Sequence, residues 1–262
     1  MFLKEEKIKR YLKDLKSALN QKEFEINCFK KYSASSEEKL LPDFSKLKGE
    51  DFKLGENWGG KDKSCWFTAE FEVPEGWEKL NGNIYLKIIP GRSHPGGLSG
   101  AESLLYLNGS PVQGLDHNHT LVKLGKKDLE NNKLAVAVKA FSGLEAEKKK
   151  FEQAALIYRD PAVEDFYNLA KTLMDSITTM SEGDNLRQKL LNKLNQAFNL
   201  IDFRKPGSAE FKQTAARANK YLKEMPPLEM RKFASLKLAG IYLKKEMFID
   251  TGLTFAILIF SV

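Results

Sequence analysis

A chain of 262 residues is longer than most single domains, and its 42% hydrophobic and 29% charged residues are typical of a folded globular protein, not of a disordered or fibrous one. The net charge of +7 does not indicate a nucleic-acid partner, because lysines and glutamates are interleaved along the predicted helices as on a solvated surface. Two cysteines, Cys28 and Cys65, are too few for a disulfide framework or a metal cluster, and we expect free thiols.

The first residues and the apolar runs predict a cytoplasmic protein with no membrane partner. Met1, Phe2 and Leu3 are followed at once by charged residues, so the apolar core of a signal peptide is missing. The apolar run after Thr251 is shorter than the ~20 residues that a membrane helix requires.

An amphipathic helix is predicted near the N-terminus, within a unit spanning residues 1–22. Apolar residues recur there at three- and four-residue spacing among charged ones, so this helix needs a surface to pack on. The residues in question are Ile8, Tyr11, Leu12, Leu15 and Leu19. A single short strand is expected next, because Phe24, Ile26 and Cys28 alternate with polar residues. The polar stretch after Ser33, continuing to Asp43, is typical of an exposed connection.

The middle of the chain predicts antiparallel strands over residues 23–144. From Cys65 to Val73 apolar and polar residues alternate, which leaves Trp66 on the polar face, exposed unless a loop or another domain covers it. Further strands are expected at residues 83–89, 104–107, 120–124 and 134–141. Asn108-Gly109 predicts a two-residue hairpin, since both positions of a type I′ turn need positive φ. Short strands without intervening helices indicate an antiparallel sandwich or jelly roll.

A helical domain is predicted from residue 145 to residue 246. Asp160-Pro161 supplies an N-cap and a first-turn proline, Gly183-Asp184 separates the first helix from the second, and Ser208 caps a third. A fourth helix is expected over residues 228–245. The remaining residues, 247–262, form an apolar tail that predicts a strand without neighbours, through which copies of the chain would associate.

Several motifs in one order carry a family resemblance. They are Trp58-Gly59-Gly60-Lys61-Asp62, Trp66-Phe67, Ser99-Gly100-Ala101-Glu102, Leu105-Tyr106-Leu107-Asn108-Gly109, Pro111-Val112-Gln113-Gly114-Leu115-Asp116-His117-Asn118-His119 and Ala140-Phe141-Ser142-Gly143. Together they resemble the N-terminal region of bacterial glycoside hydrolase family 38 α-mannosidases, closely over 57–143 and more loosely to about Met225. The resemblance implies an α+β fold: a galactose-binding-like jelly roll, preceded by a helix and followed by a helical segment.

The same resemblance implies a role in carbohydrate metabolism, but the residues that the family uses for catalysis are missing from this sequence. In the family, retaining hydrolysis of α-mannosides uses a catalytic Asp and a divalent metal such as zinc, both held in a domain that begins where this sequence ends. Ile249-Asp250-Thr251 echoes the metal-holding strand, but Phe248 stands where a histidine is expected. We therefore expect a non-catalytic N-terminal portion without its own cofactor, shortened by a premature stop, a frameshift or gene splitting.

Two alternatives stay open at this point: a stand-alone carbohydrate-binding module, and an obligate subunit of a separately encoded catalytic chain. The expected partner is accordingly a mannose-containing saccharide or a catalytic α-mannosidase domain. Asp116, His117, Asn118 and His119 offer an acceptor, amide donors and titratable rings suited to sugar hydroxyls, or they satisfy turn backbone groups.

Two tryptophans and two carboxylates complete the candidates for carbohydrate binding or an interface. Trp58 and Trp66 could stack on a pyranose ring or pack between domains. Asp62 and Glu102 come from the same motifs. The three histidines, the third being His94, are too few for a zinc site.

Overall fold

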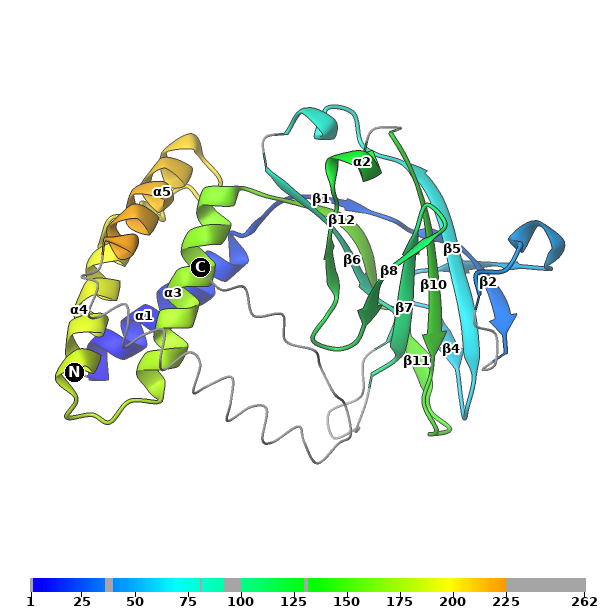
Figure 1. Ribbon diagram of the computed structural model, residues 1–262, viewed down its shortest axis with the longest axis horizontal. Coiled ribbons are helices and arrows are strands. Elements are labelled where there is room, and N and C mark those ends of the chain that lie inside the picture. The colour runs from blue at the N-terminus through cyan, green and yellow to red at the C-terminus, as the bar shows by residue number, and fades with distance from the viewer. Residues whose placement is uncertain (1, 36–39, 81, 92–99, 130–131, 225–262) are drawn as a thin grey trace, which may run out of the picture. The chain divides into compact units, whose positions relative to one another are not determined.

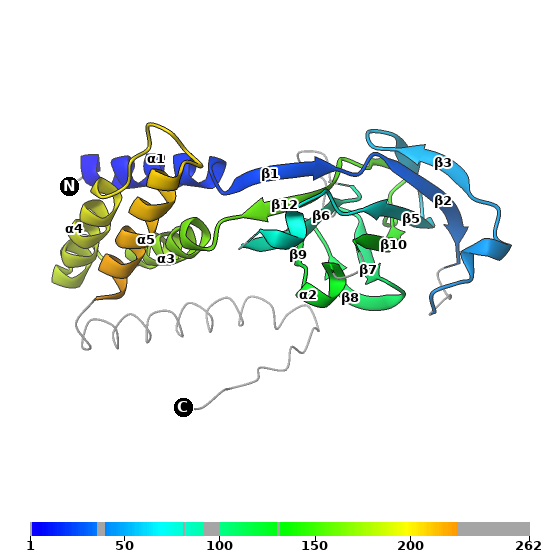
Figure 2. The same ribbon diagram turned by 90° about the horizontal axis from the view of Figure 1, so that it is seen from above.

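The computed structural model describes residues 2–35, 40–80, 82–91, 100–129 and 132–224, and these fall into two compact units. Residues 20–161 form a β-sandwich, and the described residues 2–19 and 162–224 form a helical unit (Figures 1 and 2). The predicted fourth helix (228–245) and apolar tail (247–262) lie outside the described residues. Within the described residues, no helix is both long enough and apolar enough to cross a membrane.

The sandwich consists of two antiparallel sheets, which Figure 1 shows as facing layers, and a short third pair. The six-stranded sheet has the order β3-β2-β5-β10-β7-β8, with β2 (Cys28–Ala34), β3 (Glu50–Lys53), β5 (Ser64–Glu72), β7 (Glu102–Leu107), β8 (Ser110–Leu115) and β10 (Lys133–Phe141). The four-stranded sheet has the order β1-β12-β6-β9, with β1 (Asn20–Glu25), β6 (Asn83–Ile89), β9 (Leu121–Lys123) and β12 (Gln153–Arg159). The third pair is β4 (Asn57–Gly59) with β11 (Lys148–Lys150), and the short helices are η1 (Phe44–Lys46), η2 (Trp77–Lys79) and α2 (Lys126–Leu129).

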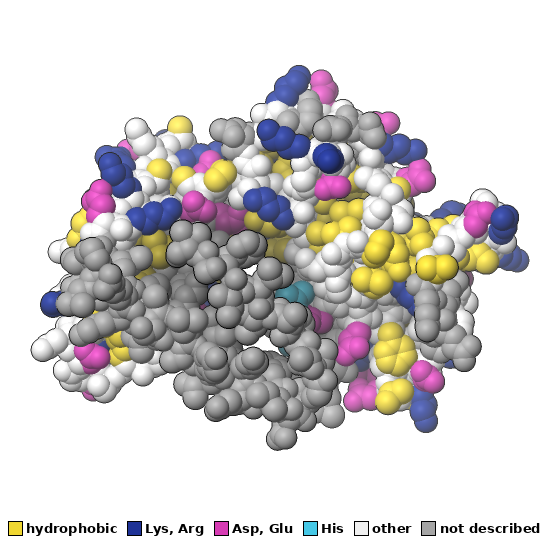
Figure 3. Space-filling model, in the orientation of Figure 1, with side chains coloured by type: hydrophobic (Ala, Val, Ile, Leu, Met, Phe, Trp, Pro, Cys, Tyr) yellow, Lys and Arg dark blue, Asp and Glu magenta, His cyan; other side chains and the backbone are white. Residues whose placement is uncertain are grey.

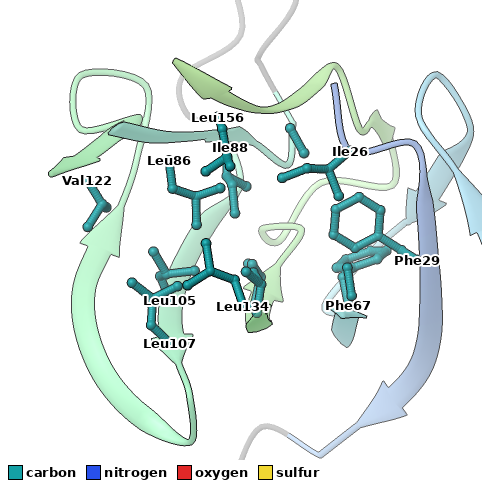
Figure 4. Close-up of a cluster of buried hydrophobic side chains, with 14 of the residues drawn as sticks. Ile26, Phe29, Phe67, Leu86, Ile88, Leu105, Leu107, Val122, Leu134 and Leu156 are labelled. Atoms are coloured by element: carbon teal, nitrogen blue, oxygen red, sulfur yellow. The ribbon is translucent and has the colours of Figure 1, made fainter. Parts of the chain in front are cut away.

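The main core lies between the two large sheets. Figure 4 shows its side chains pointing toward one another from both layers, among them Phe67, Leu105 and Leu134 from the six-stranded sheet and Leu86 and Leu156 from the other. The alternation read from the sequence places Phe67 and Ala69 in this core, as predicted for β5.

The hairpin predicted at Asn108-Gly109 is confirmed. Both residues connect β7 to β8 with positive φ, 49° for Asn108 and 83° for Gly109, as a type I′ turn requires. The Asn108 side chain also accepts the N–H of Ala135 at 3.1 Å, so the turn is fixed to the neighbouring strand β10.

The start of the sandwich differs from the sequence prediction. One strand was expected around Phe24 to Cys28, but β1 and β2 lie in different sheets. Between them Ile26 is buried in the core and donates its N–H to Ala154 at 2.9 Å, so the chain crosses from one sheet to the other there. Crossing between layers breaks the strand, although the apolar alternation continues through the break.

The end of the sandwich also differs, since it extends to Pro161 instead of residue 144. Among the strands that were not predicted, β12 lies between β1 and β6 in the four-stranded sheet. All residues from Ala154 to Tyr158 are buried, so no polar alternation marks this strand in the sequence. A short apolar run buried on both faces cannot be told from a helix segment by periodicity alone.

Four helices make up the described part of the helical unit: α1 (Phe2–Ser17), α3 (Pro161–Thr178), α4 (Asn185–Asn199) and α5 (Ala209–Lys223). Their apolar stripes form one core, which gives α1 the surface that its sequence requires. The sequence located their starts well: Asp184 accepts the N–H of Leu186 at 2.7 Å, and Ser208 accepts that of Phe211 at 3.1 Å. A buried ion pair of 2.6 Å between Arg187 and Glu5 joins α4 to α1.

Gly59 should tolerate a methyl group far less well than Gly109. Both have positive φ, 77° and 83°, but a Cβ on Gly59 would lie 2.4 Å from Cβ of Ser142, whereas a Cβ on Gly109 meets nothing within 4 Å. We expect Gly109→Ala to cost about 1 kcal/mol from backbone strain alone, and Gly59→Ala to cost about 1–3 kcal/mol more from the clash. Urea unfolding of both variants measures this difference, and equal losses would contradict the close approach.

Candidate functional site

The loop from Asp116 to His119 connects β8 to β9 and therefore crosses from the six-stranded to the four-stranded sheet. Oδ1 of Asp116 accepts the backbone N–H groups of Asn118 and His119, each at 2.7 Å. Nδ1 of His119 lies 3.0 Å from Oδ1 and 2.9 Å from Oδ2 of the same carboxylate, to which it donates. Asp116 thus organises its own turn, the structural alternative that the sequence had left open.

These contacts also set the charge of the Asp116 carboxyl. Partial burial raises its pKa, but the hydrogen bonds from His119 and from the two backbone N–H groups outweigh burial, so the pKa lies below its usual value. Asp116 is therefore a carboxylate at neutral pH, able to accept hydrogen bonds but not to act as an acid. Next to it, the side-chain amide of Asn118 donates to Nε2 of His117 at 2.8 Å, with both residues exposed.

The two tryptophans proposed as stacking platforms are buried, which corrects that proposal. The Trp58 side chain is 2% exposed, donates Nε1–H to the carbonyl of Pro90 at 2.6 Å, and meets Phe67 edge-on at 5.1 Å. Trp66 is fully buried, although it points away from the main core. Neither ring can reach a sugar while the sandwich keeps this packing.

Trp66 is instead the base of a second apolar cluster on the outer face of the six-stranded sheet. Its ring packs against Tyr106 at 5.4 Å and edge-on against Phe44 at 5.6 Å, with Tyr32 and Leu41 beside them. The loop carrying Phe44 continues the stretch that was predicted, up to Asp43, to be an exposed connection. It is this loop that covers Trp66, one of the two kinds of cover expected from the sequence.

Asp62 and Glu102 line one shallow groove of about 470 Å³, also on this sheet. The groove includes Leu104, Lys139 and Phe141, and none of the residues 116–119 belongs to it. The structure thus divides the predicted site residues into a turn (116–119), two buried rings and a pair of exposed carboxylates. They do not form one site.

A larger groove on the same outer face was missed by the sequence reasoning. It measures about 540 Å³ and includes Tyr32, Phe44 and Thr68. Of these residues, only Thr68 lies in a predicted strand, whereas Tyr32 and Phe44 lie just outside the predicted connection. The one feature of the sequence that could have indicated this groove is Trp66, because a tryptophan on the polar face of a strand requires other residues to cover that face.

For a metal, the described residues offer no group of three or more His, Cys, Asp or Glu side chains. His94 lies outside them.

The fold defines the class of protein: an antiparallel jelly roll in which glycines and aromatic residues pack closely at the turns. Its family follows from the match of residues 26–172 to alpha-mannosidase jelly roll domains. The chain belongs to this family, which confirms the resemblance to the N-terminal region of α-mannosidases and the predicted jelly roll.

Other comparisons give less. No curated protein matches this chain. A β-glucuronidase of Ruminococcus gnavus is 12% identical, with 53% of this chain and 29% of that chain covered at a TM-score of 0.35. A calcium-binding mutant of Bacteroides uniformis β-glucuronidase 2 is 15% identical, with 52% and 18% covered at a TM-score of 0.38. The chain therefore spans less than a third of these solved structures.

Replacing Asp116 by Asn should destabilise the protein only above the pH at which the carboxyl titrates. A lowered folded-state pKa stabilises the fold above the usual value of 3.8, and this stabilisation is lost as the pH falls through the folded-state pKa. We expect a loss of about 1 kcal/mol at pH 7, which shrinks as the pH falls below 3.8 and through the folded-state pKa. Thermal unfolding across pH measures it, with His117→Ala as a control in the same loop. A loss that stays the same at every pH, including far below the usual carboxyl pKa, would refute the charge-based account.

Proposed function

We propose that this chain is the non-catalytic jelly roll portion of a glycoside hydrolase family 38 α-mannosidase, in which a separate catalytic domain cleaves α-mannosides. The observation that carries the proposal is the family match over residues 26–172, which spans most of the sandwich. The motifs Trp58-Gly59-Gly60 and Asn108-Gly109 carry part of the family resemblance. They support the proposal because the first packs within the sandwich and the second forms a turn of it.

The chemistry supports a division of labour between this chain and a catalytic domain. Retaining hydrolysis needs two carboxyl groups about 5–5.5 Å apart, one of them able to donate a proton. Asp116 is held as a carboxylate by its own loop, and the described residues contain no group of three or more His, Cys, Asp or Glu side chains. We infer that the catalytic carboxylates, and the divalent metal that would orient sugar hydroxyls, belong to the catalytic domain.

This domain reaches the chain either along the same polypeptide or as a separate subunit. The third hypothesis, a stand-alone module that stacks sugar on Trp58 and Trp66, is disfavoured by the burial of both rings. A cytoplasmic location is part of the proposal. It is supported by Cys28 and Cys65, which are free thiols as in a reducing compartment.

The purified chain should not hydrolyse 4-nitrophenyl α-mannoside, with or without added zinc, calcium or cobalt. It should bind an isolated family 38 catalytic domain that lacks its own jelly roll, raising the midpoint of thermal unfolding of that domain. Calorimetry and a chromogenic assay test both points, with an unrelated β-sandwich as the control. Metal-dependent hydrolysis by this chain alone, abolished by Asp116→Asn, would overturn the proposal, as would failure to bind the catalytic domain at about 100 μM.

A further inference from the structure

The outer face of the six-stranded sheet contains an open groove of about 540 Å³, here called the outer groove. This volume falls within the roughly 300–1,000 Å³ of small-molecule sites. Figure 3 shows hydrophobic side chains gathered over the region of β7, β8 and β10, whereas the outer groove itself is lined mainly from β2, β5, β10 and η1. The residues used below are Lys30, Tyr32, Phe44, Asp51, Thr68, Glu70, Ala135 and Ala137.

One wall of the outer groove is aromatic and is held firmly in place. Tyr32 and Phe44 pack at 5.0 Å, and Phe44 rests edge-on upon the buried Trp66. The turn before Phe44 is capped, because Asp43 accepts both the N–H and the hydroxyl of Ser45, at 3.2 and 2.6 Å. Both wall rings remain partly exposed, so they offer aromatic surface to a ligand.

Gly49 makes room for this wall. A Cβ at position 49 would lie 2.5 Å from the Tyr32 ring, so any larger residue would displace the ring. Since φ of Gly49 is not in the left-handed region, the requirement is close approach alone.

The floor of the outer groove is low because β10 contributes two alanines to it. On β5 and β10, Thr68 pairs with Ala137 and Glu70 with Ala135, all on the face that Trp66 shares. Large rings next to small floor residues create a step in the sheet surface. The hollow therefore follows from strand register and does not depend on a loose loop.

The polar groups at its rim are matched in charge. Nζ of Lys30 lies 2.6 Å from Asp51, and Glu70 lies 2.8 Å from Nζ of Lys133, a residue next to the groove that does not line it. Each carboxylate thus has an ammonium partner, which leaves the rim rich in donors and acceptors but without an excess of either charge. Such a rim suits a neutral ligand that carries many hydroxyl groups, whereas a phosphate or an acidic ligand would need unpaired cations.

We propose that the outer groove binds a neutral oligosaccharide, one pyranose face packing on Tyr32 and Phe44 and the hydroxyls bonding to Thr68, Asp51 and Glu70. An aromatic wall with a hydroxyl and charge-paired carboxylates matches the apolar face and polar edge of a pyranose ring. α-Linked mannosides are the first candidates, and only that choice of sugar rests on the proposed function.

Titration calorimetry of the full chain with α-linked mannotriose, cellotriose and xylotriose tests this inference. We expect dissociation constants of about 0.1–5 mM, typical of partly exposed aromatic contacts. Ala135→Phe fills the groove without removing a backbone bond and should weaken binding at least tenfold. Thr68→Val removes one hydroxyl at nearly constant volume and should weaken it about threefold to fivefold.

A matched pair of acidic residues supplies the control. Asp51 lines the outer groove and pairs with Lys30, while the adjacent Glu50 pairs with Lys31 at 2.7 Å and does not line it. Asp51→Asn should weaken binding severalfold, whereas Glu50→Gln should leave it unchanged. Thermal unfolding verifies that each variant is folded.

The outcomes separate this inference from the proposed function. Binding of cellotriose or xylotriose but not mannotriose, lost in Ala135→Phe, supports the groove and counts against the mannoside assignment. If no saccharide binds at about 20 mM, or folded Ala135→Phe binds like the wild type, the inference is overturned. It is also overturned if Ala135→Phe abolishes association with a catalytic domain while no sugar binds, since the groove is then a protein-docking surface.

Discussion

Two adjacent aromatic residues on β5, Trp66 and Phe67, determine how the sandwich is built. Because successive side chains of a strand point to opposite faces, Phe67 enters the main core and Trp66 enters the outer cluster. Phe67 lies 5.0 Å from both Phe52 and Phe151, so it links elements that are distant in sequence. Burying each such ring contributes about 1.5–3 kcal/mol, and β5, bonded to β2 and β10, brings both contributions to the middle of one sheet.

The outer cluster around Trp66 determines the shape of the outer face of the six-stranded sheet. A sheet that buries Trp66 needs a cover, and Phe44 with its capped turn supplies one from the same chain. The cover raises a wall over small floor residues, and the outer groove results from that difference in height. The packing of this face and the shape of the outer groove therefore both depend on the position of Trp66.

The sequence predicted those parts of the fold that depend on local chemistry. Ser208 and the Asn108-Gly109 turn were found because capping and positive φ require particular residue types. Strand β12 was not predicted because its residues are buried without alternation. The outer groove was not predicted because it depends on the strand register that brings Thr68 beside Ala137. Register between distant strands is set by the whole sheet and cannot be read from either segment alone.

The motifs that carried the family resemblance turn out to serve mainly packing and turns. Gly59 touches Ser142, whose hydroxyl donates to the carbonyl of Gly60 at 2.5 Å, and Trp58 is tied to Pro90. Asp116 holds its own loop. This is why the resemblance identified the fold correctly but placed the candidate sugar contacts on Trp58 and Trp66, which are inaccessible.

Trp66 is covered by its own chain, because Phe44 and Tyr106 pack against its ring on the outer face of the six-stranded sheet. The chain can be labelled with 5-fluorotryptophan, and each of the three resonances assigned by a single Trp→Phe replacement. The solvent isotope shift between H₂O and D₂O then reports exposure ring by ring in dilute protein. We expect almost no shift for Trp66 at any protein concentration. A shift as large as that of free fluorotryptophan, or one that vanishes only at high concentration, would contradict this account.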